Sequence, residues 1–311
     1  MTKQEAKDRL EKLRKEINHH RYQYHVLNKQ EISDEALDSL KHELTKIESQ
    51  FPELITADSP SQRVAGKALD KFAKVKHQVT QWSLNDAFDE AEMRAFDARV
   101  KRMLGKLGID AKEVDYSAEL KIDGLHVVLT YEEGRLVVGA TRGDGVVGEN
   151  VTQNLRTIES VPLHLRENAS VIVEGEVWMS RHAFEALNKR QTAEGKPLYA
   201  NPRNVAAGSI RQLDARITAS RNLDAFLYDL SAGEVVDTQI HELERLRELG
   251  FKTNPHYQHC KNIDDVLAFW KKWQQKRDAV DYWFDGIVVK VNRRDWQQKL
   301  GYTGKAPRWA V

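Results

Sequence analysis

A short polar corner between two apolar segments constrains this chain most strongly. Residues 114–120 and 125–131 both have the character of strands, and the stretch Glu119-Leu120-Lys121-Ile122-Asp123-Gly124 joins them. A lysine at a strand end becomes a nucleophile when desolvation or neighbouring cations lower its pKa and free the amine. Asp123 could orient that amine or hold a metal, and Gly124 lets backbone and ligand approach closely. The plainer alternative is a strand-to-turn corner with a surface lysine.

Further strand patterns follow the corner. Residues 125–131 and 136–141 flank the turn Glu132-Glu133-Gly134, which is typical of a β-hairpin, and the second strand leads to Arg142. In the strand pattern at 171–179, Glu174 and Glu176 lie two apart and therefore project from one face. That face is either solvated, or one of its carboxylates reaches a ribose or a metal.

The segment Phe284-Asp285-Gly286-Ile287-Val288-Val289-Lys290-Val291 is a valine-rich strand that contains a lysine. Lys290 should be partly desolvated there, which is unfavourable unless its ammonium meets an anion. The alternative is a lysine at a sheet edge whose head reaches water. The first interpretation makes Lys290 a second candidate for contact with an anionic ligand.

The N-terminal residues predict an αα-hairpin. A helix is expected over 3–28, and Ser33 is a plausible N-cap for a second helix that ends near Phe51-Pro52. The hairpin holds a polar cluster at the end of its first helix and the start of its second, consisting of Tyr24, His25, Asp34 and Asp38. Helix packing could bring these groups together. Otherwise Asp34 serves the helix N-terminus, and Tyr24 and His25 are ordinary packing residues.

A basic block covers residues 201–221, where Arg203, Arg211, Arg216 and Arg221 face a single acid, Asp214. Such a patch suits phosphate contacts, and a solvated helix face is the competing interpretation. The chain as a whole has a net charge of only +1, so nucleic-acid contacts must come from local patches of this kind.

Composition excludes several classes of protein. The single cysteine, Cys260, rules out an internal disulfide framework and a cysteine-based zinc site. The sequence contains no apolar run long enough to span a membrane, and its N-terminus lacks the apolar core of a signal peptide. We therefore expect a cytoplasmic protein that has no membrane partner. The oligomeric state does not follow from the sequence, and a monomer is the expectation.

The ordered motifs resemble those of covalent nucleotidyltransferases, the superfamily of DNA ligases, RNA ligases and capping enzymes. They are Lys121-Ile122-Asp123-Gly124, Glu176, the 285–290 segment and Lys305-Ala306-Pro307-Arg308-Trp309. The bacterial NAD-dependent DNA ligases are the closer match. Segments at 19–25, 58–64, 140–145 and 201–214 also resemble that family, so the resemblance runs from about residue 5 to the last residue.

The resemblance implies an α+β fold in two domains. Residues 1–68 would form a small helical domain that binds the nicotinamide mononucleotide (NMN) half of NAD. Residues 69–311 would form a nucleotidyltransferase (adenylation) domain of antiparallel sheets and helices. The family pattern continues beyond Trp309 to a further lysine, so we expect an adenylation fragment that ends before its final motif.

The family's functional residues can be carried over position by position. Lys121 would be the nucleophile, with Asp123 beside it and Lys290 on the α-phosphate. Glu119 would contact the adenine, and Arg142 and Glu176 the ribose and neighbouring groups. Ser83 and Leu84 would line the adenosine pocket. The NMN site would comprise Tyr24, His25, Asp34, Leu37 and Asp38, where Leu37 replaces the family's usual tyrosine. Trp82 and Ala215 are further departures from the pattern.

The resemblance implies a DNA ligase that uses NAD and Mg²⁺. The Lys121 amine would attack the α-phosphorus of NAD, NMN would leave, and a lysyl-AMP adduct would remain. In a complete ligase the AMP would activate the 5′-phosphate of nicked double-stranded DNA. Arg203, Arg211 and Arg277 match arginines that serve DNA or later steps. We expect no protein cage for Mg²⁺, which could be contacted through Glu176. The alternatives are an ATP-dependent nucleotidyltransferase and a catalytically silent DNA-binding fragment.

Overall fold

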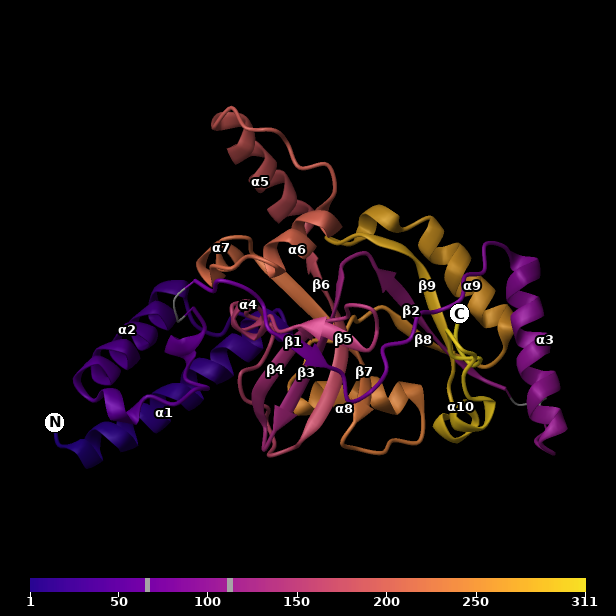
Figure 1. Cartoon of the computed structure of the whole chain (residues 1–311), viewed down its shortest axis with the longest axis horizontal. Coiled ribbons are helices and arrows are strands. Elements are labelled where there is room, and N and C mark those ends of the chain that lie inside the picture. Colours follow the sequence, from indigo (N-terminus) through magenta and orange to yellow (C-terminus); the bar gives the residue numbers. More distant parts are fainter. Residues whose placement is uncertain (65–67, 111–113) are drawn as a thin grey trace.

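The computed structural model describes residues 1–64, 68–110 and 114–311. The fold is α+β, as predicted, and every strand pairing between its named strands is antiparallel. In Figure 1 an N-terminal helical hairpin lies at the left, a four-stranded sheet lies in the centre, and a second sheet with its helices lies at the right. No helix in the described part of the chain is both long and apolar enough to cross a membrane.

The helical hairpin consists of α1 (Lys3–Arg21), which continues as a π-helical turn (Tyr22–Val26), and α2 (Asp34–Gln50). The predicted helix over 3–28 is therefore two kinds of helix in succession. Ser33 caps α2, as predicted, because its hydroxyl accepts the backbone N–H of Ala36. The apolar stripes of the two helices face each other and form a small core that includes Leu10, Leu13, Ile17 and Leu44.

The segment after α2 fastens the hairpin to the rest of the chain. It contains the 3₁₀ turns Pro52–Leu54 and Pro60–Gln62. The buried guanidinium of Arg63 donates hydrogen bonds to the carbonyls of Arg156, Ile158 and Val161 at 2.9–3.0 Å. The predicted domain boundary, between residues 68 and 69, lies one residue after 65–67, which are outside the described residues.

The four-stranded sheet has the order β4-β3-β6-β7. Its strands are β3 (Leu125–Glu132), β4 (Arg135–Thr141), β6 (Val171–Met179) and β7 (Leu223–Ala232). The turn between β3 and β4 has positive φ at Glu133 and Gly134, as a tight hairpin needs. Helices α4 (Thr152–Leu155), α6 (Pro202–Ile210) and α8 (Gln239–Leu249) contact this sheet, and its apolar side chains join theirs in the largest core.

The three-stranded sheet has the order β8-β2-β9, with β2 (Tyr116–Ile122) in the centre. Its outer strands are β8 (Tyr257–Cys260) and β9 (Phe284–Val291). Helices α3 (Glu90–Lys106), α9 (Ile263–Gln274) and α10 (Arg294–Leu300) pack with it. Trp178 and Phe226 belong to the four-stranded sheet but are buried in this second core, so they tie the two sheets together.

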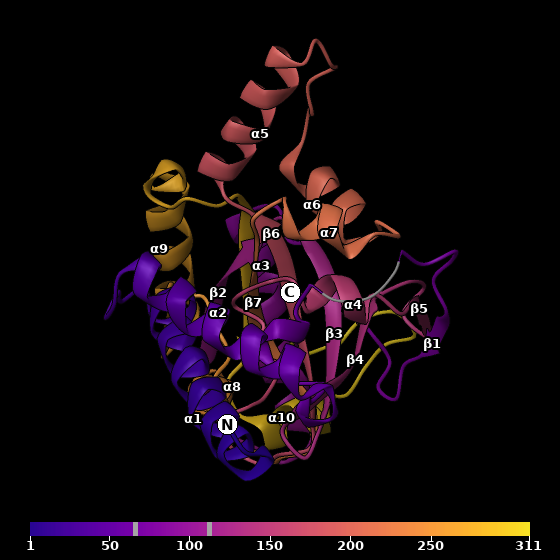
Figure 2. The same ribbon diagram turned by 90° about the vertical axis from the view of Figure 1, so that its left-hand side faces the viewer.

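Smaller elements complete the fold. Strands β1 (Lys74–Lys76) and β5 (Val147–Glu149) form a two-stranded sheet. Helix α7 (Ala215–Ala219) follows α6, and a 3₁₀ turn (Arg277–Ala279) precedes β9. Helix α5 (Arg181–Ala193) stands away from the body of the molecule in both views (Figures 1 and 2).

Candidate active site

A cavity of about 360 Å³ is lined by residues of both sheets. Strands β2 and β9 contribute from one sheet, and β3, β6 and β7 contribute from the other. The lining includes these residues named from the sequence: Leu84, Glu119, Lys121, Glu174, Glu176, Arg203 and Lys290. The cavity therefore gathers side chains that are up to about two hundred residues apart in the chain.

Lys121 lies at the end of β2, opposite Gly286 of β9. This register places its ammonium beside Asp285, with Nζ 2.9 Å and 3.1 Å from the two carboxylate oxygens. The side chain is 41% exposed, so the amine can be reached from the cavity and from solvent. Asp123, two residues on, lies 3.5 Å from a guanidinium nitrogen of Arg203. An anion therefore holds Lys121, and a cation faces the neighbouring carboxylate.

Lys290 is buried, with a residue exposure of 6%, which settles the question left open by the sequence. Its Nζ lies 3.4 Å from Glu119 Oε1 and 4.0 Å from Asp229 Oδ2, and it donates to the carbonyl of Tyr228 at 3.3 Å. Burial opposes the charge of this lysine, but the carboxylates of Glu119, Asp229 and Glu242 outweigh it and raise the pKa of Lys290. Burial also raises the pKa of Glu119. Both Lys290 and Glu119 therefore hold their protons to a higher pH than they would in water.

The acidic wall of the cavity comes from β6 and β7. Glu174 and Glu176 share one face of β6, as predicted, and Glu174 pairs with Asp229 in the register. Burial, and then the charge of Asp229, raise the pKa of Glu174 to about 7. The pKa of Glu176 is also raised to about 7, and burial is the main cause. Ser231 donates a hydrogen bond to Glu174 at 2.5 Å.

His126, Tyr228 and Asp285 were not identified from the sequence. His126 Nδ1 lies 2.9 Å from Tyr228 Oη, which lies 3.3 Å from Glu176 Oε2. His126 and Tyr228 look like ordinary strand residues in the sequence. Asp285 did have a signal, because it precedes Gly286 as Asp123 precedes Gly124.

The segment before α3 forms another wall. Arg142 donates to the hydroxyl of Ser83 at 2.7 Å and to the carbonyl of Gln81 at 3.3 Å, while Leu84 lines the cavity itself. Trp82 also lines the cavity and stacks on Tyr302, with the ring centroids 5.0 Å apart. The ring planes are inclined by 24°, so the two aromatics form a continuous apolar surface.

The structure places the predicted NMN residues apart from this cavity; none of them is among its lining residues. Tyr24 and His25 form an edge-to-face pair, with centroids 4.7 Å apart, at the π-helical end of α1. Burial, and then the charges of Arg21 and Arg63, lower the pKa of His25 to about 3. On α2, Leu37 is buried in the hairpin core, Asp38 pairs with Lys41, and Asp34 accepts from Gln30.

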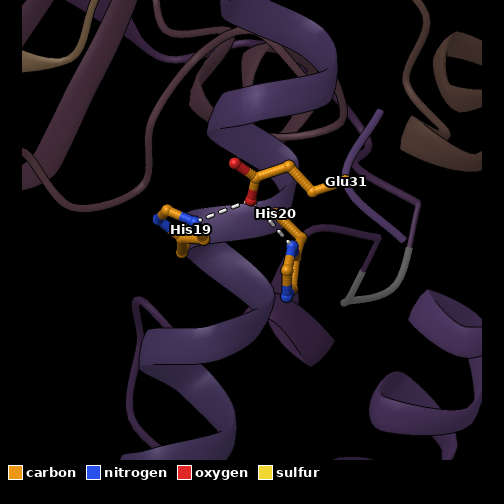
Figure 3. Close-up of side chains that lie close together, drawn as sticks. All are labelled: His19, His20 and Glu31. Carbon is orange, nitrogen blue, oxygen red and sulfur yellow. Dashed lines mark hydrogen bonds and ion pairs between the residues drawn. The ribbon is translucent and has the colours of Figure 1, made fainter. Parts of the chain in front are cut away.

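Within the described residues, one cluster of three side chains has metal-ligand geometry, and it lies in the hairpin (Figure 3). Glu31 lies 2.9 Å from Nε2 of His19 and 3.5 Å from Nδ1 of His20. The three ligand atoms lie within 4.8 Å of one another, and the contacts join the loop before α2 to α1. The cluster is separate from the cavity.

The predicted DNA arginines occupy different places. Arg203, at the start of α6, lines the cavity, whereas Arg211 pairs with Glu149 at 2.9 Å next to the small β1–β5 sheet. Arg277 lies in the 3₁₀ turn before β9, and its carbonyl accepts a hydrogen bond from Arg181. They do not form one compact cluster around the cavity.

The glycines of the two Asp-Gly pairs, Gly124 and Gly286, should differ in how much their replacement by alanine lowers the stability of the fold. A Cβ at Gly124 would lie 2.2 Å from the carbonyl oxygen of Val177 and 2.9 Å from Glu176 Cγ, whereas a Cβ at Gly286 would meet nothing within 4 Å. We expect Gly124→Ala to lower the free energy of unfolding by about 1–3 kcal/mol, because β6 must shift. Gly286→Ala is the matched control and should change it by less than about 0.5 kcal/mol. Urea unfolding of both variants measures the difference, and equal losses would contradict the close approach of β6.

Comparison with known proteins identifies the family. Residues 69–311 match the family model described as the NAD-dependent DNA ligase adenylation domain, and residues 3–65 match the DNA ligase-like N-terminal NAD⁺-binding domain. The DNA ligase of Thermotoga neapolitana is 49% identical over 99% of this chain and 44% of its own length. The DNA ligase of Bacillus cytotoxicus is 47% identical over 100% of this chain and 46% of its own length.

The chain thus spans less than half the length of these relatives. The two matches adjoin in the order that the sequence motifs predict, and between them they cover nearly all of the chain. The chain therefore belongs to the NAD-dependent DNA ligase family, of which it carries the N-terminal NAD⁺-binding domain and the adenylation domain.

Proposed function

We propose that this chain is the module of a DNA ligase that takes AMP from NAD onto Lys121. The observation that carries the proposal is the position of Lys121, whose ammonium stands at the wall of a nucleotide-sized cavity beside Asp285. The buried ammonium of Lys290 lines the same cavity, where a phosphate would meet a preorganised positive charge.

Other residues in and beside the cavity have roles in this proposal; Ser83, Asp123 and Arg142 lie beside it and are not among its lining residues. Glu119 contacts the adenine, and Ser83 and Leu84 line the adenosine pocket. Arg142 and Glu176 hold the ribose and its neighbouring groups. The hydrogen bond that Arg142 donates to Ser83 supports a shared role of Arg142 and Ser83 at the adenosine. Asp123 steadies the site through Arg203.

The hairpin supplies the NMN half of the site. We assign Tyr24, His25, Asp34, Leu37 and Asp38 to NMN, with residues 1–68 as the NMN-binding domain and residues 69–311 as the nucleotidyltransferase domain. The cavity lining includes none of these five residues. For one NAD molecule to contact both the hairpin and the cavity, the two domains would therefore have to change their relative position. The edge-to-face Tyr24–His25 pair offers the aromatic surface that a nicotinamide ring needs.

The proposed reaction is a single displacement at phosphorus. Lys121 gives up a proton, for which the adjacent Asp285 carboxylate is the nearest acceptor, and its Nζ attacks the α-phosphorus. An N–P bond forms, the P–O bond to NMN breaks, and NMN leaves with the bonding electron pair. Lys290 stabilises the negative charge that develops on the phosphate oxygens. The product is lysyl-AMP, held as a phosphoramidate.

Mg²⁺ is a further requirement that we propose from the family. It binds few protein ligands and usually keeps waters and substrate phosphates. The cavity fits this mode, because Glu176 offers a carboxylate while the described residues place no three-ligand cluster there. When bound, the ion would neutralise phosphate charge.

The proposed role in the whole ligase extends to nicked double-stranded DNA. AMP would pass from Lys121 to the 5′-phosphate at the nick, and the 3′-hydroxyl would then displace it. Arg203, Arg211 and Arg277 are the arginines that we propose for DNA or for these later steps. We propose that the protein acts as a monomer in the bacterial cytoplasm, where DNA as substrate would place it at the nucleoid.

Labelled nucleotides test the proposal. The chain is incubated with Mg²⁺ and either NAD or ATP labelled in the adenylate, and the protein is examined for a mass increase of one AMP. We expect the adduct with NAD and not with ATP. An adduct from ATP would make the chain an ATP-dependent nucleotidyltransferase, and an adduct from neither would leave a DNA-binding fragment.

Substitutions in the helical hairpin should affect the reaction with NAD but not the binding of AMP. Asp34→Ala or Tyr24→Ala should slow adduct formation from NAD by about tenfold, the effect of one or two lost polar contacts, and leave AMP binding unchanged. The reason is that these side chains would touch only the departing half of NAD. Glu35→Ala is the control at the same exposed helix start. Equal losses in the NAD and AMP assays would point to damage of the fold instead.

A further inference from the structure

A partly buried chain of hydrogen bonds runs along the cavity wall from Gln81 through His126 to Tyr228. His126 Nε2 lies 2.9 Å from Gln81 Oε1, and His126 Nδ1 lies 2.9 Å from Tyr228 Oη. Both His126 and Tyr228 line the cavity. Neither has a part in the reaction steps proposed above.

The amide of Gln81 fixes the direction of these bonds. Its Nε2 donates to the carbonyl of Val79 at 2.8 Å, so its oxygen must be the atom that faces His126. An amide oxygen only accepts, and therefore His126 Nε2 carries the hydrogen. A second acceptor, Glu174 Oε2, lies 3.6 Å from the same nitrogen and favours the same tautomer.

This tautomer leaves Nδ1 of His126 with a free lone pair. The Tyr228 hydroxyl has one hydrogen and two acceptors in reach, His126 Nδ1 at 2.9 Å and Glu176 Oε2 at 3.3 Å, and the shorter of the two contacts is the one to Nδ1. Burial, and then the charge of Arg142, lower the pKa of His126 to about 4, and burial raises the pKa of Tyr228 above its usual value. Both groups are therefore neutral near pH 7, where only one direction of donation is open to them.

We propose that His126 is a positioning residue of the adenylation cavity, which takes the hydroxyl hydrogen of Tyr228 and thereby fixes how Tyr228 meets Glu176 and Lys290. With its hydrogen directed at His126, the Tyr228 oxygen can only accept across the 3.3 Å contact with Glu176 Oε2, and the protonated form of Glu176 supplies the donor. Burial favours that form, because it raises the pKa of Glu176 to about 7. The backbone carbonyl of Tyr228 accepts from Lys290, whose ammonium also lies 5.5 Å from the Tyr228 ring. The inference rests on the proposed function, because these are the groups assigned to ribose and α-phosphate.

Two isosteres of opposite kind test the role. In His126→Asn the side-chain oxygen can replace Nδ1 as the acceptor, whereas in His126→Gln the amide reaches the place of Nε2 and leaves Tyr228 without its acceptor. We expect the rate of adduct formation at limiting NAD to fall about fivefold in His126→Gln, the value of one hydrogen bond, and no more than about twofold in His126→Asn. Glutamine is closer to histidine in volume, so a role in packing alone predicts the opposite order and would overturn the proposal.

A double-mutant cycle with Tyr228→Phe gives an independent readout. If His126 acts through the Tyr228 hydroxyl, His126→Gln should cause no further loss once that hydroxyl is gone. A full fivefold loss in the Tyr228→Phe background would show that His126 acts by another route. Denaturant unfolding of each variant shows whether the fold is intact.

The tautomer itself can be measured without any reaction. Nitrogen-15 NMR of the histidine-labelled wild-type chain should show His126, assigned by its absence in His126→Asn, with a hydrogen on Nε2 and none on Nδ1. A hydrogen on Nδ1 would overturn the proposal outright. If the wild-type chain formed no adduct from NAD, the proposed function would fail while this measurement still decided the tautomer.

Discussion

Replacing Lys121 with alanine should abolish the adduct formed from NAD. The reaction needs an amine at the cavity wall, and alanine supplies no nucleophile. The fold should survive, because the Lys121 side chain is 41% exposed and its ion pair with Asp285 is open to solvent. We expect the free energy of unfolding to change by less than about 0.5 kcal/mol. Mass spectrometry of the protein after incubation with NAD and Mg²⁺ measures the adduct.

An exposed lysine elsewhere serves as the control for that result. Lys271, on α9, is 59% exposed and pairs with Glu90 away from the cavity. Lys271→Ala should form the adduct at the parental rate. An undiminished adduct in Lys121→Ala would mean that AMP is carried by another residue, and the assignment of the nucleophile would have to be abandoned.

The change Lys290→Met should damage both stability and reaction. Methionine fills much of the same space but leaves Glu119 and Asp229 without the cation that faces them. Breaking a buried charge pair in this way costs about 3–5 kcal/mol of folding free energy. Loss of one preorganised charge from the phosphate should slow adduct formation at least about a hundredfold. Urea unfolding and single-turnover adduct formation at saturating NAD measure the two effects.

A compensating change separates the two effects. In the double variant Lys290→Met with Glu119→Gln, one unpaired carboxylate is removed, so most of the lost stability should return. The rate should stay far below that of Glu119→Gln alone, which carries the same change at the proposed adenine contact, because the cation for the phosphate is still missing. Recovery of the rate together with the stability would show that Lys290 serves only the fold.

The strands and capped helices of this chain could be predicted from local sequence. The strand over 171–179 and the start of α2 after Ser33 follow from alternation and from a capping residue. Helix α5 was not predicted, although Ser180 caps it, because it projects from the body and its core-facing residues Ala183, Phe184 and Leu187 cover only its first two turns. The strands β1 and β5 have three residues each, which is too short for a pattern to form.

The site residues that belong to sequence motifs could be predicted. The contacts between side chains that are distant in the sequence could not. Nothing local to Lys121 shows that Asp285, 164 residues further on, will hold its ammonium. The contact arises from the antiparallel register of β2 with β9. The same holds for His126 and Tyr228, which meet only because β3 and β7 both flank β6. Such pairs are properties of the sheet and not of any segment.

Trp82 has a consequence for spectroscopy. Its indole stacks on Tyr302 and lines the cavity, and it is 37% exposed, whereas Trp178, Trp296 and Trp309 are each less than 8% exposed. Indole emission depends on the polarity around the ring and on aromatic neighbours that can quench it. A nucleotide base that enters the cavity would change both the polarity around the Trp82 ring and its aromatic neighbours. The chain therefore carries a natural fluorophore that can report nucleotide occupancy without an attached dye.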